Sequence, residues 1–515
     1  MQPTDLPPFA YAPLTPVTFL RRSAAVFPDR VAVVDGNLQL SYAELAERSA
    51  RWAGALRARG LARGDRVAVL APNSHLLLEA HTGPAQAGVV LVALNTRLAV
   101  AEVATILDAS GARLLVAHAD LLAAARDAAE RTAADIEVVA ALDWEDELAA
   151  AEPLDEPVTD ELSLLSLNYT SGTTGQPKGV QYHHRGAYLQ ALAMVVHARL
   201  DARSSYLWTL PMFHCNGWAF TWAVTAAGGT HVCLPAIDPP EAWRLVRDEG
   251  VTHFCAAPTV LTMLASSPAA AQVDTGVRAF TGGAPPTPAL LEELDGLGVE
   301  VVHLYGLTES FGPSVICEWH PEWDELPPRE RAEVTARQGV GNVLGGGVRV
   351  VDPTTGDDVA RDEETLGEIV LRGNTLMAGY LDDPDATAAA TTPDGWFRTG
   401  DLAVVHADGY VEIRDRAKDI IVSGGENISS VEVERVLARH PAVLEAAVVG
   451  VPHERWGERP RAHVVLRDGA NASAEELRAH VREHLAGFKV PDEVVFGELP
   501  RTSTGKIQKH VLRDR

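Results

Sequence analysis

The sequence predicts an α/β protein with a large N-terminal domain, made of two α/β halves and a small β unit, and a small α+β C-terminal domain. Three observations lead to this prediction. Strand-like apolar runs alternate with helix-like segments from Ser41 to Leu304, which is typical of a mostly parallel sheet covered by helices. From Gly341 to Arg372 the pattern becomes one of short strands and turns. After the charged run Arg414–Asp419 a new pattern begins, and it is long enough to fold alone.

The first half opens with a clear helix signal. Ser41 and Glu44 have the spacing of a capping box, and Gly60 is placed to end the helix that follows. The acidic, proline-containing segment 151–161 is expected to be a connector. Strands are then expected at 66–70, 89–94 and 113–117, and helices at 73–87 and 101–109.

The second half repeats the alternation. Asp238 is a suitable N-cap, with Pro239 at the first helical position and Glu241 at the third, so a helix should begin there. Strands are expected at 164–167, 206–210, 230–234, 253–256, 278–281 and 299–304, with a helix at about 184–199. In the C-terminal domain, helices are expected at 430–439 and 474–485, and strands at 446–451 and 463–466.

Composition excludes some classes of partner. The chain has 515 residues and a formal net charge of -26, which argues against nucleic acid and against an anionic membrane surface. The four cysteines form no Cys-x-x-Cys pair, and Met1 to Pro16 lacks a signal-peptide pattern, so we expect a reducing cytoplasmic setting. The segment Ser204–Ile237 carries no charged residue, but Pro211 and a Gly-Gly pair interrupt it, so we expect buried core rather than a membrane span.

The loop Tyr169–Gly179, Tyr-Thr-Ser-Gly-Thr-Thr-Gly-Gln-Pro-Lys-Gly, has the composition of a phosphate cradle. Its glycines let the backbone approach a polyanion, its hydroxyls add donors, and Lys178 adds a cation. It follows a strand pattern and precedes a helix pattern. The spacing differs from a Walker A loop, because the lysine comes three residues after Gly175 and past a proline. The alternative is a flexible surface loop.

Further stretches combine glycines with single polar residues. Thr281–Pro285 ends a strand with two glycines, which suits either a nucleotide crevice or a plain turn. Glu309, after the next strand, suits Mg²⁺ near phosphates. Asp401 can accept hydrogen bonds from a cis-diol. Lys506 is a cation on a short Gly/Thr loop near the C-terminus.

Together these stretches resemble the adenylate-forming superfamily, which includes acyl-CoA synthetases, beetle luciferases and the adenylation domains of nonribosomal peptide synthetases. The Tyr169–Gly179 loop is similar to its signature loop. Its other motifs follow in family order as Tyr305-Gly-Leu-Thr-Glu309, Thr399-Gly-Asp401, Ser423-Gly-Gly-Glu-Asn427 and Pro500–Lys509, over nearly the whole chain. The resemblance implies an ATP-dependent acyl-CoA synthetase that uses ATP, Mg²⁺, CoA and a small carboxylic acid.

The resemblance also implies residue roles. Thr308 contacts the α-phosphate, Glu309 holds the metal, Tyr305 borders the adenine, and Lys506 bridges the carboxylate substrate and the α-phosphate. The full set of nucleotide-binding residues that it implies is Thr170, Ser171, Gly172, Thr173, Thr174, Gly175, Lys178, Gly283, Ala284, Pro285, Tyr305, Gly306, Asp401 and Arg416.

On the acyl side, the resemblance places His214 at the mouth of the pocket and counts Gly282 among the substrate-binding residues. Trp218 and Phe311 are bulky enough to shorten an acyl tunnel, or they belong to the core. We therefore expect a short- or medium-chain fatty acid or a small aryl acid. His183 and His184 have no metal-ligand partners in the sequence and are interpreted as ordinary loop residues.

The C-terminal domain carries the second half of the expected chemistry. Gly424 and Gly425 resemble the glycine loop that lines the pantetheine channel, with a simple turn as the alternative. Members of the superfamily rotate this domain, so we expect it to be mobile. The predicted domains are 1–415 and 419–515, with a hinge at 416–418 centred on Lys418.

Three other functions stay open. The activated acid could pass to a carrier-protein thiol, an amine or another nucleophile. A kinase or NTPase would need a Walker A loop or an Arg-Asp catalytic loop, and neither is present. A non-catalytic nucleotide-binding scaffold is disfavoured because Glu309, Asp401 and Lys506 all occur. A homodimer is an open alternative to a monomer.

Overall fold

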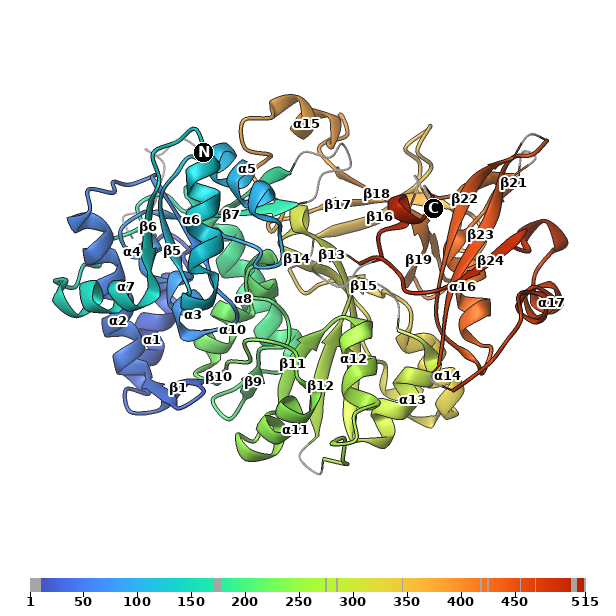
Figure 1. The fold of residues 1–515 in the computed structure, drawn as a ribbon, viewed down its shortest axis with the longest axis horizontal. Coiled ribbons are helices and arrows are strands. Elements are labelled where there is room, and N and C mark those ends of the chain that lie inside the picture. The colour runs from blue at the N-terminus through green and yellow to red at the C-terminus, as the bar shows by residue number, and fades with distance from the viewer. Residues whose placement is uncertain are drawn as a thin grey trace.

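Two large sheets stand side by side in the N-terminal part of the chain, and two smaller sheets follow (Figure 1). The computed structural model describes residues 11–170, 177–273, 276–283, 286–344, 346–416, 419–423, 426–453, 455–467, 469–501 and 507–513. The predicted α/β class is confirmed, with the C-terminal residues at one end of the molecule, in orange and red in Figure 1.

The first sheet has six strands in the order β6-β5-β3-β4-β7-β8. All neighbours are parallel except the β7–β8 pair. Its strands are β3 (Arg66–Leu70), β4 (Val90–Ala93), β5 (Ala112–Ala117), β6 (Glu137–Ala140), β7 (Leu164–Thr170) and β8 (Lys178–His183). The helices of this half are α2 (Tyr42–Ala58), α3 (His75–Ala80), α4 (Gly83–Gln86), α5 (Val100–Ser110), α6 (Leu122–Arg131), α7 (Ala141–Ala150) and α8 (His184–Ala198).

The capping signals predicted the start of α2 correctly, whereas the prediction of one long helix in this half was wrong. The capping box of Ser41 and Glu44 opens α2 as predicted. The single helix expected at 73–87 is instead two short ones, α3 and α4. Pro84 explains the break, because a proline lacks the N–H that a continuing helix needs and fits the first turn of a new one.

The second sheet has nine strands in the order β15-β14-β13-β12-β11-β9-β10-β1-β2. Its strands are β1 (Val31–Asp35), β2 (Leu38–Ser41), β9 (Ser205–Leu207), β10 (Thr230–Val232), β11 (His253–Ala256), β12 (Val277–Thr281), β13 (Val299–Leu307), β14 (Gly312–Ile316) and β15 (Val340–Gly341). The N-terminal strand β1 lies parallel to β10, with Val33 opposite His231, so the start of the chain belongs to the second sheet. The two halves are therefore not separate in sequence.

The main core joins the two large sheets. One cluster of buried side chains includes Val67 and Leu91 from the first sheet and Tyr206 and Phe280 from the second. Much of the uncharged segment 204–237 lies in this cluster, partly through α10 (Phe220–Ala227), which confirms the prediction of buried core. In the described part of the chain, no helix has the length and apolar character that a membrane crossing requires.

The remaining helices before the C-terminal domain are α1 (Val17–Val26), α9 (Cys215–Trp218), α11 (Pro239–Asp248), α12 (Pro258–Ala265), α13 (Pro288–Gly296), α14 (Pro328–Thr335) and α15 (Pro384–Ala389). Of these helices, α11, α12 and α13 pack against strands of the second sheet in a separate buried cluster. Asp238 caps α11 by accepting a hydrogen bond from the backbone N–H of Glu241, as its sequence predicted.

Two smaller sheets complete the molecule. The first contains β16 (Gly347–Val351), β17 (Gly367–Arg372), β18 (Phe397–Val405) and β19 (Val411–Arg416). The second contains β20 (Ile421–Ser423), β21 (Glu426–Ile428), β22 (Val443–His453), β23 (Gly457–Leu466) and β24 (Glu493–Phe496), with α16 (Ser430–Ala438), α17 (Ala474–His484) and α18 (Lys509–Arg513). The two sheets are consecutive in the chain, because β19 ends at Arg416 and β20 begins at Ile421.

Candidate active site

The predicted phosphate loop connects two antiparallel strands. Thr170, at the end of β7, lies opposite Lys178, at the start of β8. The sequence analysis expected the loop to lead to a helix, and α8 does begin at His184, but the strand β8 stands between them. Residues 178–183 form a strand because they pair with β7, and their alternation places Val180 and Tyr182 in the core.

A segment from far along the chain borders β8. Residues 377–381, which we call the strap, pair with it as an extra edge segment. Leu381 N donates to Gly179 O (2.7 Å), Ala378 N donates to Gln181 O (2.9 Å), and Gln181 N donates to Gly379 O (3.1 Å). This pairing sets Tyr380 opposite Val180, next to the phosphate-loop hairpin.

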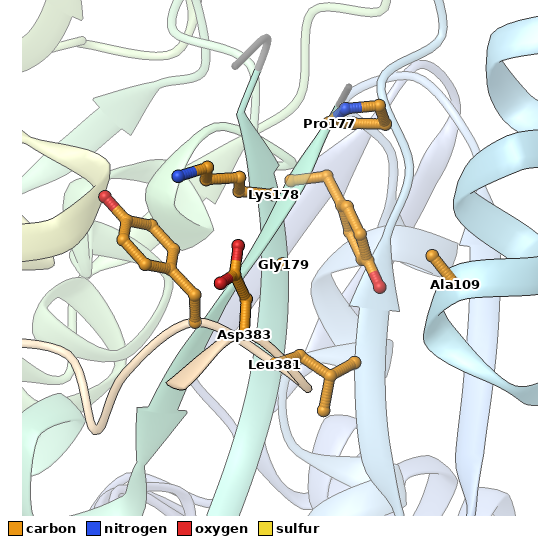
Figure 2. A pocket seen from close by; sticks show the side chains of 8 residues that line it. Ala109, Pro177, Lys178, Gly179, Leu381 and Asp383 are labelled. Carbon is orange, nitrogen blue, oxygen red and sulfur yellow. The ribbon is translucent and has the colours of Figure 1, made fainter. Parts of the chain in front are cut away.

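Tyr380 contacts both charged residues predicted for the phosphate side. The Lys178 ammonium nitrogen lies 4.7 Å from the centre of its ring. Its hydroxyl donates to Glu309 Oε1 at 2.8 Å. Lys178, Pro177 and Asp383 line a cavity of about 150 Å³, which Figure 2 shows from close by. The sequence analysis missed Tyr380, because no local pattern reports its pairing with a strand two hundred residues earlier.

The end of β13 carries the residues of the Tyr-Gly-Leu-Thr-Glu stretch. Thr308 opens a 3-10 turn, and its carbonyl accepts a hydrogen bond from the Tyr182 hydroxyl at 2.6 Å. The backbone N–H of Met377, in the strap, donates to the Glu309 carbonyl at 2.8 Å. A Cβ on Gly306 would lie 1.9 Å from the Gly312 carbonyl oxygen, so only glycine permits the close return of β14.

Tyr305, Asp401 and Arg416 form a second group, from three different strands. The Tyr305 hydroxyl donates to Asp401 Oδ2 at 2.7 Å, and Arg416 Nε lies 3.2 Å from Asp401 Oδ1. Burial, together with the neighbouring Asp401 charge, raises the pKa of the Tyr305 hydroxyl well above its usual range, so it stays a protonated donor. The residues predicted for adenine and ribose are thus brought together.

The proposed acyl side is built from unusual backbone. Asn216 and Trp218, in α9, have left-handed φ angles of 50° and 54°. Trp218 is 8% exposed, and a Cβ on Gly282 would lie 3.2 Å from the edge of its ring. Phe311 is 1% exposed and packs edge-on against Tyr182, with ring centres 3.8 Å apart. His214 is half-buried and directly precedes α9, and Gly283 follows Gly282 at the end of β12.

The histidines at the start of α8 differ from their interpretation as loop residues. His184 is the first residue of α8, it is buried, and its Nδ1 is hydrogen-bonded with the Thr15 hydroxyl at 2.9 Å. Burial lowers the pKa of His184 to about 4. His183 is the N-cap of α8, where its Nδ1 accepts from Gly186 N at 2.8 Å. Both are structural residues of the helix N-terminus.

Several predicted residues lie outside the described part of the chain. They are Ser171, Gly172, Thr173, Thr174, Gly175, Ala284, Pro285, Lys418, Gly424, Gly425 and Lys506.

The charged residues that flank the predicted hinge pair with the last helix. Lys509 Nζ lies 2.8 Å from Glu434 and donates to Ser430 Oγ at 2.5 Å. Ser430 N and Oγ both donate to Asp415, and Arg513 pairs with Asp419 at 2.8 Å. α18 therefore contacts Asp419 directly and is linked to Asp415 through Ser430.

Comparisons with known proteins agree with these motifs. A family model described as AMP-binding enzyme matches residues 20–381, and a model of the AMP-binding enzyme C-terminal domain matches residues 432–506. An acetate/butyrate–CoA ligase of Arabidopsis thaliana is 42% identical, covering 99% of this chain and 96% of its own length. A benzoate–CoA ligase of the same plant is 41% identical, covering 98% of this chain and 93% of its own. Both names carry the word peroxisomal.

A solved structure has the same architecture. The ATP-bound MatB protein of Rhodopseudomonas palustris superposes with a TM-score of 0.86 at 29% identity, covering 97% of this chain and 98% of that one. The family model spans well over half of the chain. The motif residues Lys178, Glu309 and Asp401 lie at the start of β8, just after β13 and within β18. The chain therefore belongs to the AMP-binding enzyme family, within the adenylate-forming acyl-CoA synthetase superfamily that its motifs predicted.

Proposed function

We propose that the acid activated by this acyl-CoA synthetase is a short- or medium-chain fatty acid or a small aryl acid. The observation that carries the choice of a small acid is the buried Trp218 ring, whose edge would lie 3.2 Å from a Cβ on Gly282. Two polar groups near the end of β13 support the nucleotide chemistry. Lys178, Tyr380 and Glu309 form the phosphate side, and Tyr305, Asp401 and Arg416 form the nucleoside side. The names of the two plant relatives, which specify acetate, butyrate and benzoate, support acids of this size.

The reaction has two steps. A carboxylate oxygen of the acid attacks the α-phosphorus of ATP, and pyrophosphate leaves with the bond that breaks. The CoA sulfur then attacks the acyl carbonyl carbon, and AMP leaves. Because two anions meet in the first step, catalysis depends on charge neutralisation and alignment. We assign this work to Lys178, Thr308 and Lys506.

Mg²⁺ is part of the proposal and fits the donors at Glu309. One carboxylate oxygen of Glu309 accepts from Tyr380, and within the described part of the chain no donor is bonded to the other oxygen. Carboxylate oxygens are the ligands that Mg²⁺ prefers. Bound there with ATP, the ion would neutralise phosphate charge. Tyr380 and Lys178 would hold the carboxylate and the phosphates in register.

Product analysis tests the proposal. The purified chain, MgATP and CoA are incubated with a panel from acetate to decanoate, plus benzoate, and pyrophosphate release is measured. We expect AMP and pyrophosphate in equal amounts, with the fastest rates for the short and aryl acids. ADP and phosphate instead would contradict a ligase. Rapid AMP formation that stays independent of CoA, with an acyl-hydroxamate trapped by hydroxylamine, would favour another acceptor.

Three finer points remain proposals as well. The domains are 1–415 and 419–515 with the hinge at Lys418, and the end of β19 at Arg416 supports that boundary. We propose a cytoplasmic setting, supported by four buried free cysteines. The homodimer is tested by light scattering at working concentration.

A further inference from the structure

A group of metal-ligating side chains lies at the end of α17, a helix at the edge of the molecule and far from the phosphate-loop hairpin (Figure 1). His480, Glu483 and His484 each offer one ligand atom, and these atoms all lie within 4.8 Å of one another. The spacing i, i+3 and i+4 places all three side chains on one face of the helix. Among the described residues, no other group of three or more His, Cys, Asp or Glu side chains meets this criterion.

The backbone fixes which nitrogen of each ring carries a proton. His480 Nε2 is 3.0 Å from the carbonyl oxygen of Val436, in α16. His484 Nδ1 is 2.8 Å from the carbonyl oxygen of His480. A carbonyl can only accept, so each of these nitrogens must donate. In the neutral rings, His480 Nδ1 and His484 Nε2 therefore carry lone pairs.

Hydrogen bonds of this kind orient metal-binding histidines in proteins, where the ring nitrogen that does not bind the metal donates to a carbonyl or carboxylate. Here one of the two bonds comes from a different helix, so it holds the His480 ring independently of the cluster itself.

The surroundings of His480 add one carboxylate and one further imidazole ring. Glu483 supplies a carboxylate. The His440 ring packs edge-on against His480, with centres 5.2 Å apart, but its Nδ1 accepts from Ala442 N at 3.3 Å. His440 therefore borders the site without offering that lone pair.

We propose that His480, Glu483 and His484 bind a zinc-class divalent cation on the C-terminal domain, a site separate from the Mg²⁺ of the reaction. Two imidazole nitrogens and one carboxylate oxygen are a ligand set typical of Zn²⁺, whereas Mg²⁺ prefers oxygen alone. Three protein ligands leave one tetrahedral position for water. Bridging i and i+4 also ties the last turn of α17 to the preceding one.

Titration of the tag-free full chain with ZnCl₂, in competition with a chromophoric chelator and without ATP, tests the site. We expect one equivalent to bind. In separate variants, His484→Gln and Glu483→Gln should raise the dissociation constant at least about tenfold, since even the loss of an outer hydrogen bond costs 10- to 100-fold in metal sites. The matched control is His320→Gln, an exposed histidine outside the cluster. It should leave the constant unchanged.

A second measurement replaces zinc with Co²⁺, whose visible absorption reports tetrahedral ligation by nitrogen and oxygen. This absorption should disappear in His484→Gln. Acyl-CoA formation in zinc-free buffer should be the same in all variants, so failure of this site is distinct from failure of the proposed function. Equal dissociation constants in the parent chain and His484→Gln would overturn the proposal. So would the absence of any zinc binding by the parent chain.

Discussion

Tyr380 joins two side chains of opposite charge. Its ring lies against the Lys178 ammonium and its hydroxyl is bonded to Glu309, while the strap holds its backbone against β8. Burial, with the Glu309 charge close by, raises the pKa of this hydroxyl above its usual range, so it remains a donor at every working pH. We therefore infer that Tyr380 is a positioning residue, which acts on the phosphates through its two neighbours.

Tyr380→Phe separates the two contacts, because it keeps the ring and removes the hydroxyl. Hydrogen bonds to charged groups are worth about 1.5–3 kcal/mol, so adenylation should slow by roughly 10- to 100-fold. Pyrophosphate exchange, measured over a series of Mg²⁺ concentrations, should also show a weaker apparent affinity for the ion. Tyr11→Phe, at an exposed tyrosine, is the control. An unchanged Mg²⁺ dependence would mean that the hydroxyl does not position Glu309.

Lys178→Ala and Glu309→Gln should each weaken adenylation more severely. They remove the charge that compensates the phosphates or holds the metal, an effect worth several kcal/mol in a site that excludes water. AMP formation at saturating ATP is the measurement, and Arg203→Ala, at a fully exposed cation, is the control. Unchanged rates in both variants would remove the phosphate-site assignment.

Trp218→Ala tests the acyl pocket. The ring borders Gly282, at the end of β12, so its removal should open space beside the predicted substrate site. We expect the preference of the enzyme to move toward longer or bulkier acids in the same acid panel. Thermal unfolding is measured in parallel. A folded variant with the parent's preference would place Trp218 in the core.

At the scale of elements, local signals predicted the structure well where they were sufficient on their own. The caps at Ser41 and Asp238 fixed the starts of α2 and α11, and β11 was predicted with its observed bounds. Capping depends on residues three positions apart, which the sequence displays directly.

Contacts between distant segments could not be predicted in this way. The placement of β1 beside β10 and of the strap beside β8 both depend on partners far along the chain. The candidate site likewise has a part that the sequence predicted and a part that it did not. Its motif residues Glu309 and Asp401 were identified from sequence, but the hydrogen bonds from Tyr380 and Tyr305 that hold them were not.

The element α18 offers a test of how the C-terminal domain is held together. Lys509→Met should lower the free energy of unfolding of this domain by roughly 2 kcal/mol, since it breaks charged hydrogen bonds to the buried Ser430 and the largely buried Glu434. Denaturant unfolding is the measurement. Lys489→Met, which breaks a single ion pair with Glu432 in the same domain, should cost less than about 1 kcal/mol. Equal losses would show that the Lys509 network adds nothing beyond one surface pair.

At the scale of the whole molecule, the two half-reactions should separate genetically. We expect Lys506 to be needed for adenylation and the glycine loop with Gly424 and Gly425 to face the thiol channel, and both belong to the C-terminal domain. Lys506→Ala should abolish acyl-adenylate formation and still convert supplied acyl-adenylate and CoA to thioester. Lys418→Pro should restrict the hinge and damage the thioester step more than adenylation, if the adenylating pose is the resting one.

Pyrophosphate exchange, run beside thioester formation from pre-made acyl-adenylate, distinguishes these effects. A folded Lys506→Ala variant that loses both steps equally would contradict the division of labour between the two domain orientations.

The strap also has a consequence for the synthesis and folding of the chain on the ribosome. β8 is the outermost strand of its sheet, and the segment that covers its free edge leaves the ribosome two hundred residues later. At about 5–20 residues per second, translation leaves that edge uncovered for roughly 10–40 s. An uncovered edge strand is a template for pairing with another chain. The same hairpin that frames the phosphate loop in the finished enzyme is thus open to pairing with another chain until Tyr380 has been synthesised.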